Sequence, residues 1–267
     1  MTPNRPNPPP RISGLTRLYH RLIALPLMLL GAYPRRVRAL RQVPRYLDDR
    51  AAFVAAGGHV SHKFAILDDY AEQAGTATGH YFHQDLLVAT LIQQSAPRRH
   101  IDVGSRIDGF VAHVAAFRSI DIIDIRPVKL AGHERIRYIQ GDLMQLDPAL
   151  HEVCDSLSCL HALEHFGLGR YGDPIDPQGH LTGFRNLGRM LQPGGTLYIS
   201  FPIGESAVFF NAHRVFAPTE VFDWAAGSFD LQRFDYVNDA GDLLTQQQPD
   251  QLPALRYGCG IYTFKKR

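Results

Sequence analysis

The sequence predicts an α/β fold in which helices cover both faces of a mostly parallel sheet. Strand-like and helix-like segments alternate from about residue 81 to residue 204. Parallel neighbouring strands need crossover connections, so alternation of this kind favours a parallel sheet. Two more strand-like segments, 231–237 and 257–267, follow with little helix between them. Because strands joined by a loop pair as an antiparallel hairpin, we expect the sheet to end in one.

Each element is predicted from its periodicity and from the residues that end it. Helical spacing of apolar residues marks a first helix that stops at Pro97, and an amphipathic helix closes at Pro193 and two glycines. The predicted helices are 81–97, 107–117 and 180–195. The predicted strands are 100–104, 119–125, 135–143, 154–166 (which runs into a helix start), 196–204, 231–237 and 257–267.

Length and composition favour one large domain with an extension. The chain has 267 residues, of which 45% are hydrophobic and 20% are charged, as in ordinary soluble globular proteins. We expect a basic, apolar and helical N-terminal extension at 1–60 and a domain at 61–267. The three cysteines form no CxxC pair, which argues against a disulfide framework and a zinc knuckle. We read them as small buried apolar residues in a reducing compartment.

The formal net charge of +2 hides a division along the chain. Residues 1–50 contain ten arginines and two acids, so their charge is +8, whereas the rest of the chain carries −6. A basic segment on a mildly acidic body indicates an anionic surface near that segment. Nothing in the body resembles a nucleic-acid-binding face, so we expect no nucleic-acid partner.

An apolar run, Leu22 to Tyr33, lies inside the basic segment. It has twelve residues, contains Pro26 and is flanked by arginines. Spanning a bilayer takes about 20 apolar residues, so this run is too short for a simple transmembrane helix. We favour a cytoplasmic protein whose N-terminal segment lies on the inner membrane face. A helix that covers the domain is the alternative, and a signal peptide fits less well because no small-x-small cleavage site follows.

Aspartates end three successive predicted strands. Asp102 and Gly104 follow the first strand, Asp124 the second, and Asp142 with Leu143 the third. Open α/β sheets bind ligands at the carboxyl ends of their strands, and one carboxylate can accept both hydroxyl hydrogens of a ribose. Each aspartate taken alone is also a plausible helix cap. The loop lacks the three glycines of a dinucleotide fingerprint, which argues against a nicotinamide or flavin site.

Taken together, these motifs resemble the class I S-adenosylmethionine-dependent methyltransferases over about residues 80–267. The motifs, in order, are "IDVGSR", "DIIDIRP", "YIQGDL", "DSLSCLHALEH", "LGRMLQPGGTLYISFP" and "YGCGIYTF". The resemblance implies a doubly wound, seven-stranded Rossmann-like sheet with the last strand antiparallel, and S-adenosylmethionine as cofactor. The segment "EHFGLGRYGDPIDPQGH" at 164–180 is similar to an uncharacterised subgroup, a domain of unknown function.

The resemblance also implies roles for residues of the strand ends. Asp102 and Gly104 would line the methionine portion of the cofactor, Asp124 would hold the ribose, and Asp142 and Leu143 would border the adenine. The chain departs from the family at Arg106 and Asp108, where glycine is usual. Arg106 could pair with the methionine carboxylate, or it could fill the pocket while bonded to Asp108. The predicted cofactor residues are Asp102, Gly104, Ser105, Arg106, Gly109, Asp124, Asp142 and Leu143.

A polar cluster follows the fourth strand, where an acceptor should enter. His161, Glu164 and His165 are the candidate catalytic residues, since an oxygen acceptor benefits from a general base. "HALEH" also matches a zinc-peptidase pattern, but its place in the fold argues against that chemistry. We expect no metal, although a divalent ion on several of Glu164, His165, Asp173, Asp176 and His180 stays open as an alternative. The candidate substrate residues are Arg170, Tyr171, Asn211, His213 and Arg214.

The sequence therefore predicts a methyltransferase that O-methylates a small or glycan-type hydroxylated acceptor near the membrane. The alternative is a catalytically inactive protein of the same fold that binds or scaffolds in surface-glycan assembly. A third possibility is an enzyme that uses the adenosyl site for another nucleotide. The oligomeric state is not predicted.

Overall fold

The computed structural model describes residues 39–71, 74–129 and 132–267. Its contacts divide the chain into two compact units, residues 1–76 and residues 77–267. Most of the basic N-terminal segment, including the apolar run from Leu22 to Tyr33, lies outside the described residues. Its predicted contact with a membrane therefore stays a prediction.

The described part of the first unit is built on one helix. α4 (Val43–Ala55) follows a short 3-10 turn, η2 (Leu40–Gln42), and Pro44 lies in its first turn, where the missing N–H costs nothing. The helix buries no residue, and Leu47, Phe53 and Val54 are about half exposed. A second 3-10 turn, η3, spans Asp69–Ala71. Among the described residues, no helix combines the length and the apolar character needed to cross a membrane.

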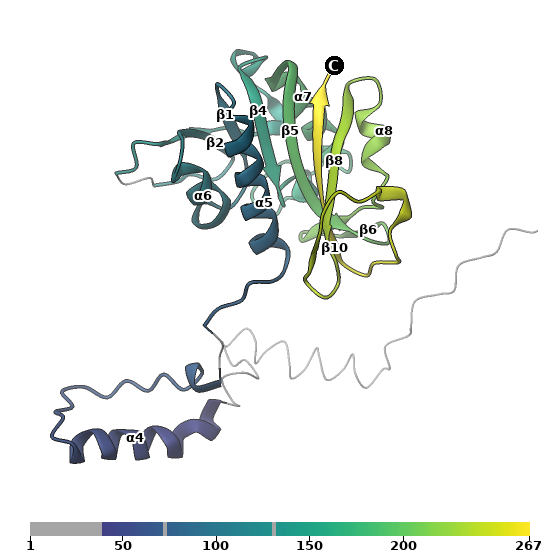
Figure 1. The fold of residues 1–267 in the computed structure, drawn as a ribbon. Coiled ribbons are helices and arrows are strands. Elements are labelled where there is room, and N and C mark those ends of the chain that lie inside the picture. The colour runs from purple at the N-terminus through teal and green to yellow at the C-terminus, as the bar shows by residue number, and fades with distance from the viewer. Residues whose placement is uncertain (1–38, 72–73, 130–131) are drawn as a thin grey trace, which may run out of the picture. The chain divides into compact units, whose positions relative to one another are not determined.

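The second unit is organised around an eight-stranded sheet (Figure 1). Its strand order is β3-β2-β1-β4-β5-β10-β8-β9. The strands are β1 (His100–Val103), β2 (Ile120–Asp124), β3 (Ile136–Gln140), β4 (Cys154–Leu160), β5 (Leu191–Ile203), β8 (Phe229–Val237), β9 (Leu243–Leu244) and β10 (Gly258–Lys266). The first five are parallel, and β10 runs antiparallel to both β5 and β8. This confirms the predicted doubly wound sheet with its last main strand antiparallel. β9 is an added edge strand, and two residues are too few to show a pattern in the sequence.

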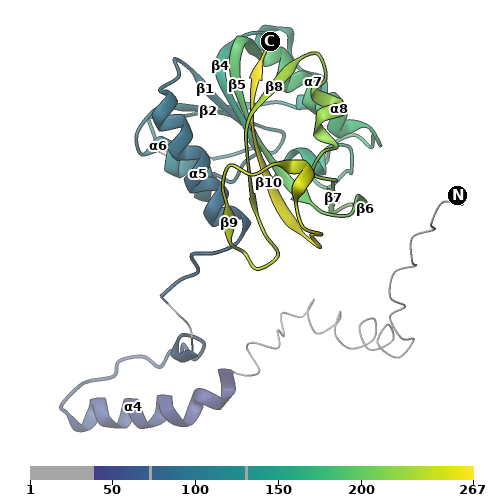
Figure 2. The same ribbon diagram turned by 45° about the vertical axis from the view of Figure 1, so that its right-hand side comes forward.

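Helices cover both faces of this sheet (Figure 2). α5 (His80–Ser95) and α6 (Ala112–Ala115) pack on one face, and α7 (Gly179–Met190) and α8 (Val221–Ala225) pack on the other. The two faces form separate apolar clusters because successive strand residues point to opposite sides. Ile122 belongs to the α5 cluster, for example, whereas its neighbour Ile123 belongs to the α7 cluster.

Smaller elements join the main ones. A π-helical turn, η4 (Ile107–Val111), precedes α6 because Gly109 has non-helical dihedrals. The 3-10 turns η5 (Leu143–Gln145) and η6 (Pro148–Leu150) link β3 to β4, and η8 spans Pro249–Gln251. A separate hairpin pairs β6 (Ala207–Phe209) with β7 (His213–Val215).

One predicted helix start is much shorter than expected. After β4 the chain makes only a 3-10 turn, η7 (Leu163–His165), and Phe166 is already extended. Gly167 then has a φ of +78°, and a Cβ there would overlap the carbonyl oxygen of Asp176. This close approach requires glycine and folds the 166–178 loop back over the carboxyl ends of the strands.

Candidate functional site

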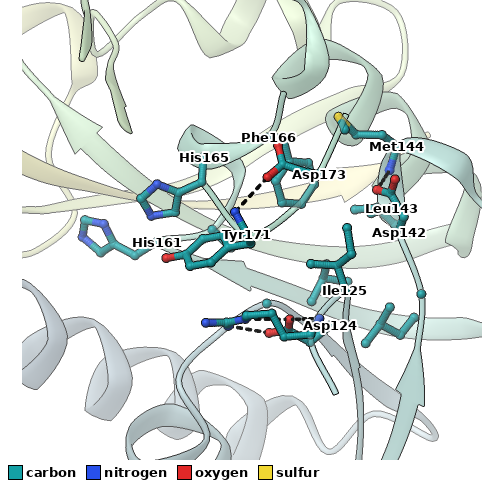
Figure 3. A pocket seen from close by; sticks show the side chains of 16 residues that line it. Asp124, Ile125, Asp142, Leu143, Met144, His161, His165, Phe166, Tyr171 and Asp173 are labelled. Atoms are coloured by element: carbon teal, nitrogen blue, oxygen red, sulfur yellow. Dashed lines mark hydrogen bonds and ion pairs between the residues drawn. The ribbon is translucent and has the colours of Figure 1, made fainter. Parts of the chain in front are cut away.

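A narrow cavity lies at the carboxyl ends of the parallel strands (Figure 3). Gly104, Asp124, Asp142 and His161, which follow or end β1, β2, β3 and β4, all line it. We call it the strand-end cavity. Its volume is about 60 Å³, against roughly 300–1,000 Å³ for typical ligand pockets. Arg126 and Tyr171 also line it. A nucleoside-sized ligand would therefore need these two side chains to move.

The loop after β1 brings its backbone close to the start of the β4 loop. Gly104 has a φ of +72°, and a Cβ on it would lie 2.9 Å from the Cβ of Ala162. Asp102 is buried beneath this loop and accepts hydrogen bonds from Ser105 N (3.1 Å), Ser105 Oγ (2.6 Å) and Ser158 Oγ (2.5 Å). Removal from water raises the pKa of Asp102 to about 6. Asp102 and Ser105 thus shape the loop and do not line the cavity.

Asp124 lies at the tip of β2 with its carboxylate bonded to Arg126. It accepts hydrogen bonds from Arg126 N (2.8 Å), Nε (2.9 Å) and Nη2 (2.6 Å). The same guanidinium lies 4.4 Å from the centre of the Tyr171 ring. The oxygens predicted to hold a ribose are therefore engaged by an arginine that the sequence analysis did not consider. The position of Arg126, two residues after Asp124, was the feature of the sequence that could have indicated this pair.

The tip of β3 supplies the third wall, as predicted. Asp142 accepts a hydrogen bond from Met144 N (2.9 Å) and so caps η5. Leu143 is buried, and its carbonyl accepts a hydrogen bond from Asn186 Nδ2 (2.7 Å). Asp142 is thus both a cap and a wall of the cavity.

Arg106 and Asp108 pair with each other at the surface. Nη2 of Arg106 lies 2.9 Å from Oδ2 of Asp108, and the two side chains are 56% and 75% exposed. The charge of Arg106 is compensated by Asp108 at the surface, and Arg106 does not line the strand-end cavity. Gly109 does not line the cavity either. A Cβ on Gly109 would lie 2.6 Å from Asp85 Oδ2, so the close packing of Asp85 requires glycine at this position. The roles of Arg106 and Gly109 in cofactor binding stay predictions.

A second cavity, of about 390 Å³, adjoins the first and shares Gly104, Arg126, His161, His165 and Tyr171 with it. We call it the histidine cavity. Its histidines are His80, His161, His165 and His213, and its arginines are Arg106, Arg126 and Arg170. Of the described residues that line it, one is acidic, Glu164. The cavity therefore favours a negatively charged or hydroxylated occupant.

His161 and Glu164 form a buried pair. Nδ1 of His161 lies 2.8 Å from Oε1 of Glu164, and the two side chains are 5% and 1% exposed. Burial opposes protonation, but the Cys259 and Glu164 side chains raise the pKa of His161 well above its ordinary value. Nε2 of His161 is enclosed and has no hydrogen-bond partner among the described residues. An acceptor could reach that atom only if its surroundings moved.

His165 is held in one tautomer. Its Nδ1 lies 2.6 Å from the Ala212 carbonyl oxygen, which can only accept, so Nδ1 carries the hydrogen. Nε2 then has a free lone pair and lies 3.7 Å from Glu164 Oε1. Burial lowers the pKa of His165, although the Glu164 charge works in the opposite direction. The neutral ring lines both cavities, which suits a general base.

The other predicted substrate residues divide into two groups. Arg170, Tyr171 and His213 line the histidine cavity, and Arg170 Nη1 donates to the Ala212 carbonyl (3.1 Å). Asn211 is exposed in the β6–β7 turn, with a φ of +60°, and lines neither cavity.

Arg214 corrects the sequence analysis, because its guanidinium is buried and bonded to the backbone. It donates to the carbonyls of Glu164 (3.3 Å), Phe166 (2.6 Å), Asp176 (3.5 Å) and Pro177 (3.2 Å). It ties the 166–178 loop to β7 and lines neither cavity. The five residues left open as metal ligands do not form a metal-binding group. The carboxylate of Asp173, one of them, accepts hydrogen bonds from the N–H groups of Gly167, Gly169 and Tyr171.

Comparison with known proteins agrees with this architecture. A family described as "Caenorhabditis protein of unknown function, DUF268" matches residues 129–243, which include the distinctive 164–180 segment. No curated protein matches the chain. Among solved structures the chain is similar to the [4+2]-cyclase SpnF, with 16% identity, a TM-score of 0.51, and coverage of 79% of this chain and 89% of that one. The chain has the class I methyltransferase fold.

Two other structures resemble the chain less closely. One is the N-methyltransferase NodS from Bradyrhizobium japonicum WM9 in complex with S-adenosylhomocysteine, with 16% identity, a TM-score of 0.47, and coverage of 70% of this chain and 88% of that one. The other is YcgJ from Bacillus subtilis, with 13% identity, a TM-score of 0.49, and coverage of 69% and 98%.

Four residues of the methyltransferase-fold domain reach the site without a local signal in the sequence. His80 and Tyr81 come from the start of α5, and Tyr257 and Cys259 from the start of β10. Because β10 is antiparallel, its first residues lie at the same edge as the carboxyl ends of β1 to β5. Only the assembled fold brings His80, Tyr81 and Tyr257 to the histidine cavity and Cys259 close to His80 and His161.

Proposed function

We propose that this protein is an S-adenosylmethionine-dependent methyltransferase. The observation that carries the proposal is the convergence of Gly104, Asp124 and Asp142 on one cavity at the tips of β1, β2 and β3. Ligands of open α/β sheets bind at this position. Asp124 would accept the two ribose hydroxyls, and Asp142 and Leu143 would border the adenine.

Arg126 must leave Asp124 before a ribose can bind there. The Arg126 side chain is 48% exposed and that of Asp124 is 11% exposed, so the pair contributes at least the roughly 1 kcal/mol of a good exposed ion pair. A charged hydrogen bond to the ribose is worth about 1.5–3 kcal/mol. Hydrogen bonds to the ribose would offset the loss of the ion pair, and the released guanidinium can stay against Tyr171.

The acceptor would enter through the histidine cavity. Its hydroxyl oxygen attacks the methyl carbon, the carbon–sulfur bond breaks with its electron pair going to sulfur, and S-adenosylhomocysteine leaves as a thioether. Nε2 of His165 accepts the hydroxyl proton, and Glu164, 3.7 Å away, stabilises the resulting imidazolium. Alignment of oxygen, carbon and sulfur supplies much of the rate.

The lining of the histidine cavity supports an acceptor that carries both a hydroxyl and a negative charge. Arg170 and His213 face it together with Tyr171 and Tyr257. A sugar acid or a phosphorylated glycan precursor has this chemistry. The ten arginines of residues 1–50 support a location near an anionic membrane. Flotation with anionic liposomes of the full chain, compared with a chain that starts at residue 77, tests this location.

A specific observation favours the second candidate, a non-catalytic binding or scaffold protein. The carboxylate of Asp124 is fully engaged by Arg126. The fold itself does not fix the reaction, because SpnF is described as a [4+2]-cyclase. If Arg126 holds Asp124 permanently, the strand-end cavity stays too small for an adenosyl group.

Calorimetric titration of the full chain with S-adenosylmethionine and S-adenosylhomocysteine separates the two candidates. We expect both ligands to bind, with binding weakened in Asp124→Ala. Asp250→Ala, an exposed aspartate outside both cavities, is the matched control and should bind normally. Absence of heat from the folded protein would contradict the methyltransferase and favour the scaffold.

A further inference from the structure

A cluster of three potential metal ligands lies beside the histidine cavity. His80 begins α5, His161 follows β4, and Cys259 is the second residue of β10. Each offers one ligand atom, and these atoms all lie within 4.8 Å of one another. In the part of the chain that the structure describes, this is the one such group of three. It differs from the ligand set that the sequence left open.

His161 is oriented as metal-binding histidines usually are. Its Nδ1 is bonded to Glu164 Oε1 at 2.8 Å, which leaves Nε2 as the ring nitrogen that could bind an ion. That nitrogen is buried without a hydrogen-bond partner among the described residues. A carboxylate on the far nitrogen fixes the ring of a metal-bound histidine and strengthens it as a ligand. The enclosed Nε2 could therefore bind an ion once it has lost its hydrogen.

The spacing of the two imidazole rings suits one small ion. Zn–N bonds of about 2.1 Å at a tetrahedral angle place two ligating imidazole centres about 5 Å apart. The centres of the His80 and His161 rings are 5.2 Å apart, but the two rings are stacked at an interplanar angle of 11°, so one ring must turn before both can direct a nitrogen at the same ion. The same bond lengths, with Zn–S of about 2.3 Å, require ligand atoms about 3.4–3.6 Å apart. From the 4.8 Å limit, each pair must then close by at most about 1.4 Å, which side-chain rotation can supply.

We propose that His80, His161 and Cys259 bind a zinc ion, with Glu164 as the carboxylate that positions His161. Two imidazole nitrogens and a thiolate select zinc over magnesium or calcium, which prefer oxygen. Three protein ligands leave a fourth position open, as in catalytic zinc sites. His80 and His161 line the histidine cavity, but Nε2 of His161 is enclosed, so that position would open to the proposed acceptor only after the surrounding side chains move.

The metal site would have a defined part in the reaction, and this part rests on the proposed methyl transfer. The ion would hold a hydroxyl or thiol of the acceptor next to the strand-end cavity and lower its pKa. Nε2 of His161 would then be a ligand, while His165 remains the residue that accepts the proton. Binding of the ion itself does not depend on methyl transfer.

Cobalt substitution tests the site directly in the full chain. After treatment with a chelator, the protein is titrated with Co²⁺ and then with Zn²⁺. We expect one equivalent of Co²⁺ with intense tetrahedral visible bands and a thiolate-to-cobalt charge-transfer band, all removed by Zn²⁺. Cys259→Ser should lose the charge-transfer band, whereas Cys159→Ser, a matched buried cysteine outside the cluster, should keep it.

Two further variants keep the test decisive if Cys259→Ser fails to fold. His80 begins a helix and is partly exposed, so His80→Ala should fold and lose tight Zn²⁺ binding. Glu164→Gln should weaken Zn²⁺ binding about 10–100-fold. The proposal is overturned if folded protein takes up no Co²⁺, or if His80→Ala binds Zn²⁺ normally. S-adenosylmethionine affinity, measured on the metal-free protein, reports on the proposed function separately.

Discussion

Arg126 donates two side-chain hydrogen bonds to Asp124, from Nε at 2.9 Å and from Nη2 at 2.6 Å. The pair closes the position where an adenosyl ribose would bind. The backbone N–H of Arg126 donates a third hydrogen bond to the same carboxylate. The account of this protein therefore depends on whether a ligand displaces that guanidinium.

Removing the arginine should strengthen cofactor binding. Arg126→Ala frees the Asp124 carboxylate, so we expect S-adenosylhomocysteine to bind at least about fivefold tighter, from a pair worth about 1 kcal/mol or more. Asp124→Ala should weaken binding roughly 10–100-fold, as loss of a charged hydrogen bond does. Calorimetry measures both.

Arg137→Ala is the control for that experiment. Arg137 pairs with Asp121 and lines neither cavity, so its loss should leave affinity unchanged. Loss of binding in Arg126→Ala would show instead that Arg126 is itself a ligand of the cofactor.

Gly104 should not tolerate a side chain. Both Gly104→Ala and Gly194→Ala place alanine at a φ near +70°, which costs about 1–2 kcal/mol. Only Gly104 has a neighbour in the way, the Cβ of Ala162 at 2.9 Å, whereas Gly194 has nothing within 4 Å. Urea unfolding should therefore show a larger loss for Gly104→Ala, accompanied by loss of cofactor binding. Equal losses, with binding retained, would contradict the close approach.

Asp102 should make stability depend on pH. Burial raises its pKa from 3.8 to about 6, so the folded protein binds a proton more tightly than the unfolded chain does. The free energy of unfolding should consequently fall as pH rises from about 4 to 6, by roughly 3 kcal/mol. Asp102→Asn cannot titrate and should lose this part of the slope. Urea unfolding across that range measures it, and identical slopes for the two proteins would refute the assignment.

His165 should be needed for turnover and not for cofactor binding. We expect His165→Gln to lower kcat by about 10²–10⁴-fold, the usual contribution of a general base, with unchanged S-adenosylmethionine affinity. Because burial lowers the pKa of His165, activity should fall with decreasing pH only below the ordinary histidine range. His151→Gln, an exposed histidine outside both cavities, is the control. Full activity of His165→Gln would exclude the base.

Arg214 should act through the 166–178 loop. Arg214→Met removes a donor from four carbonyl oxygens, of which that of Asp176 keeps the N–H of Gly179, and one unsatisfied buried group alone costs about 1–3 kcal/mol. We expect at least that loss of stability, with faster hydrogen exchange in the loop and a raised KM for the acceptor. Cofactor affinity should change little. Unchanged exchange in the loop would show that the guanidinium does not position it.

The order of strands and the meeting of Asp124 with Asp142 were predictable because both follow from general rules. Buried parallel strands are apolar runs between helices, and their carboxyl ends meet at one edge of the sheet. Asp102 follows the same pattern, but the sequence does not show that Ser105 and Ser158 turn its carboxylate inward. Likewise, Arg126 and Arg214 are ordinary polar residues until the fold supplies their partners.

The metal cluster could not be predicted for a different reason. His80 and Cys259 are 179 residues apart in the chain and belong to no spaced motif. Cys259 resembles the other two buried cysteines in sequence, and all three were read as apolar packing. Cys259 differs from the other two cysteines by its position in β10, because the antiparallel direction of this strand places Cys259 close to His161.

The most direct test of the account is a crystal structure of the full chain with S-adenosylhomocysteine. We predict ribose hydroxyls on the Asp124 carboxylate, adenine beside Asp142 and Leu143, and Arg126 turned away toward Tyr171. A structure at saturating ligand in which the Asp124–Arg126 pair is intact and the strand-end cavity holds no adenosyl group would contradict it.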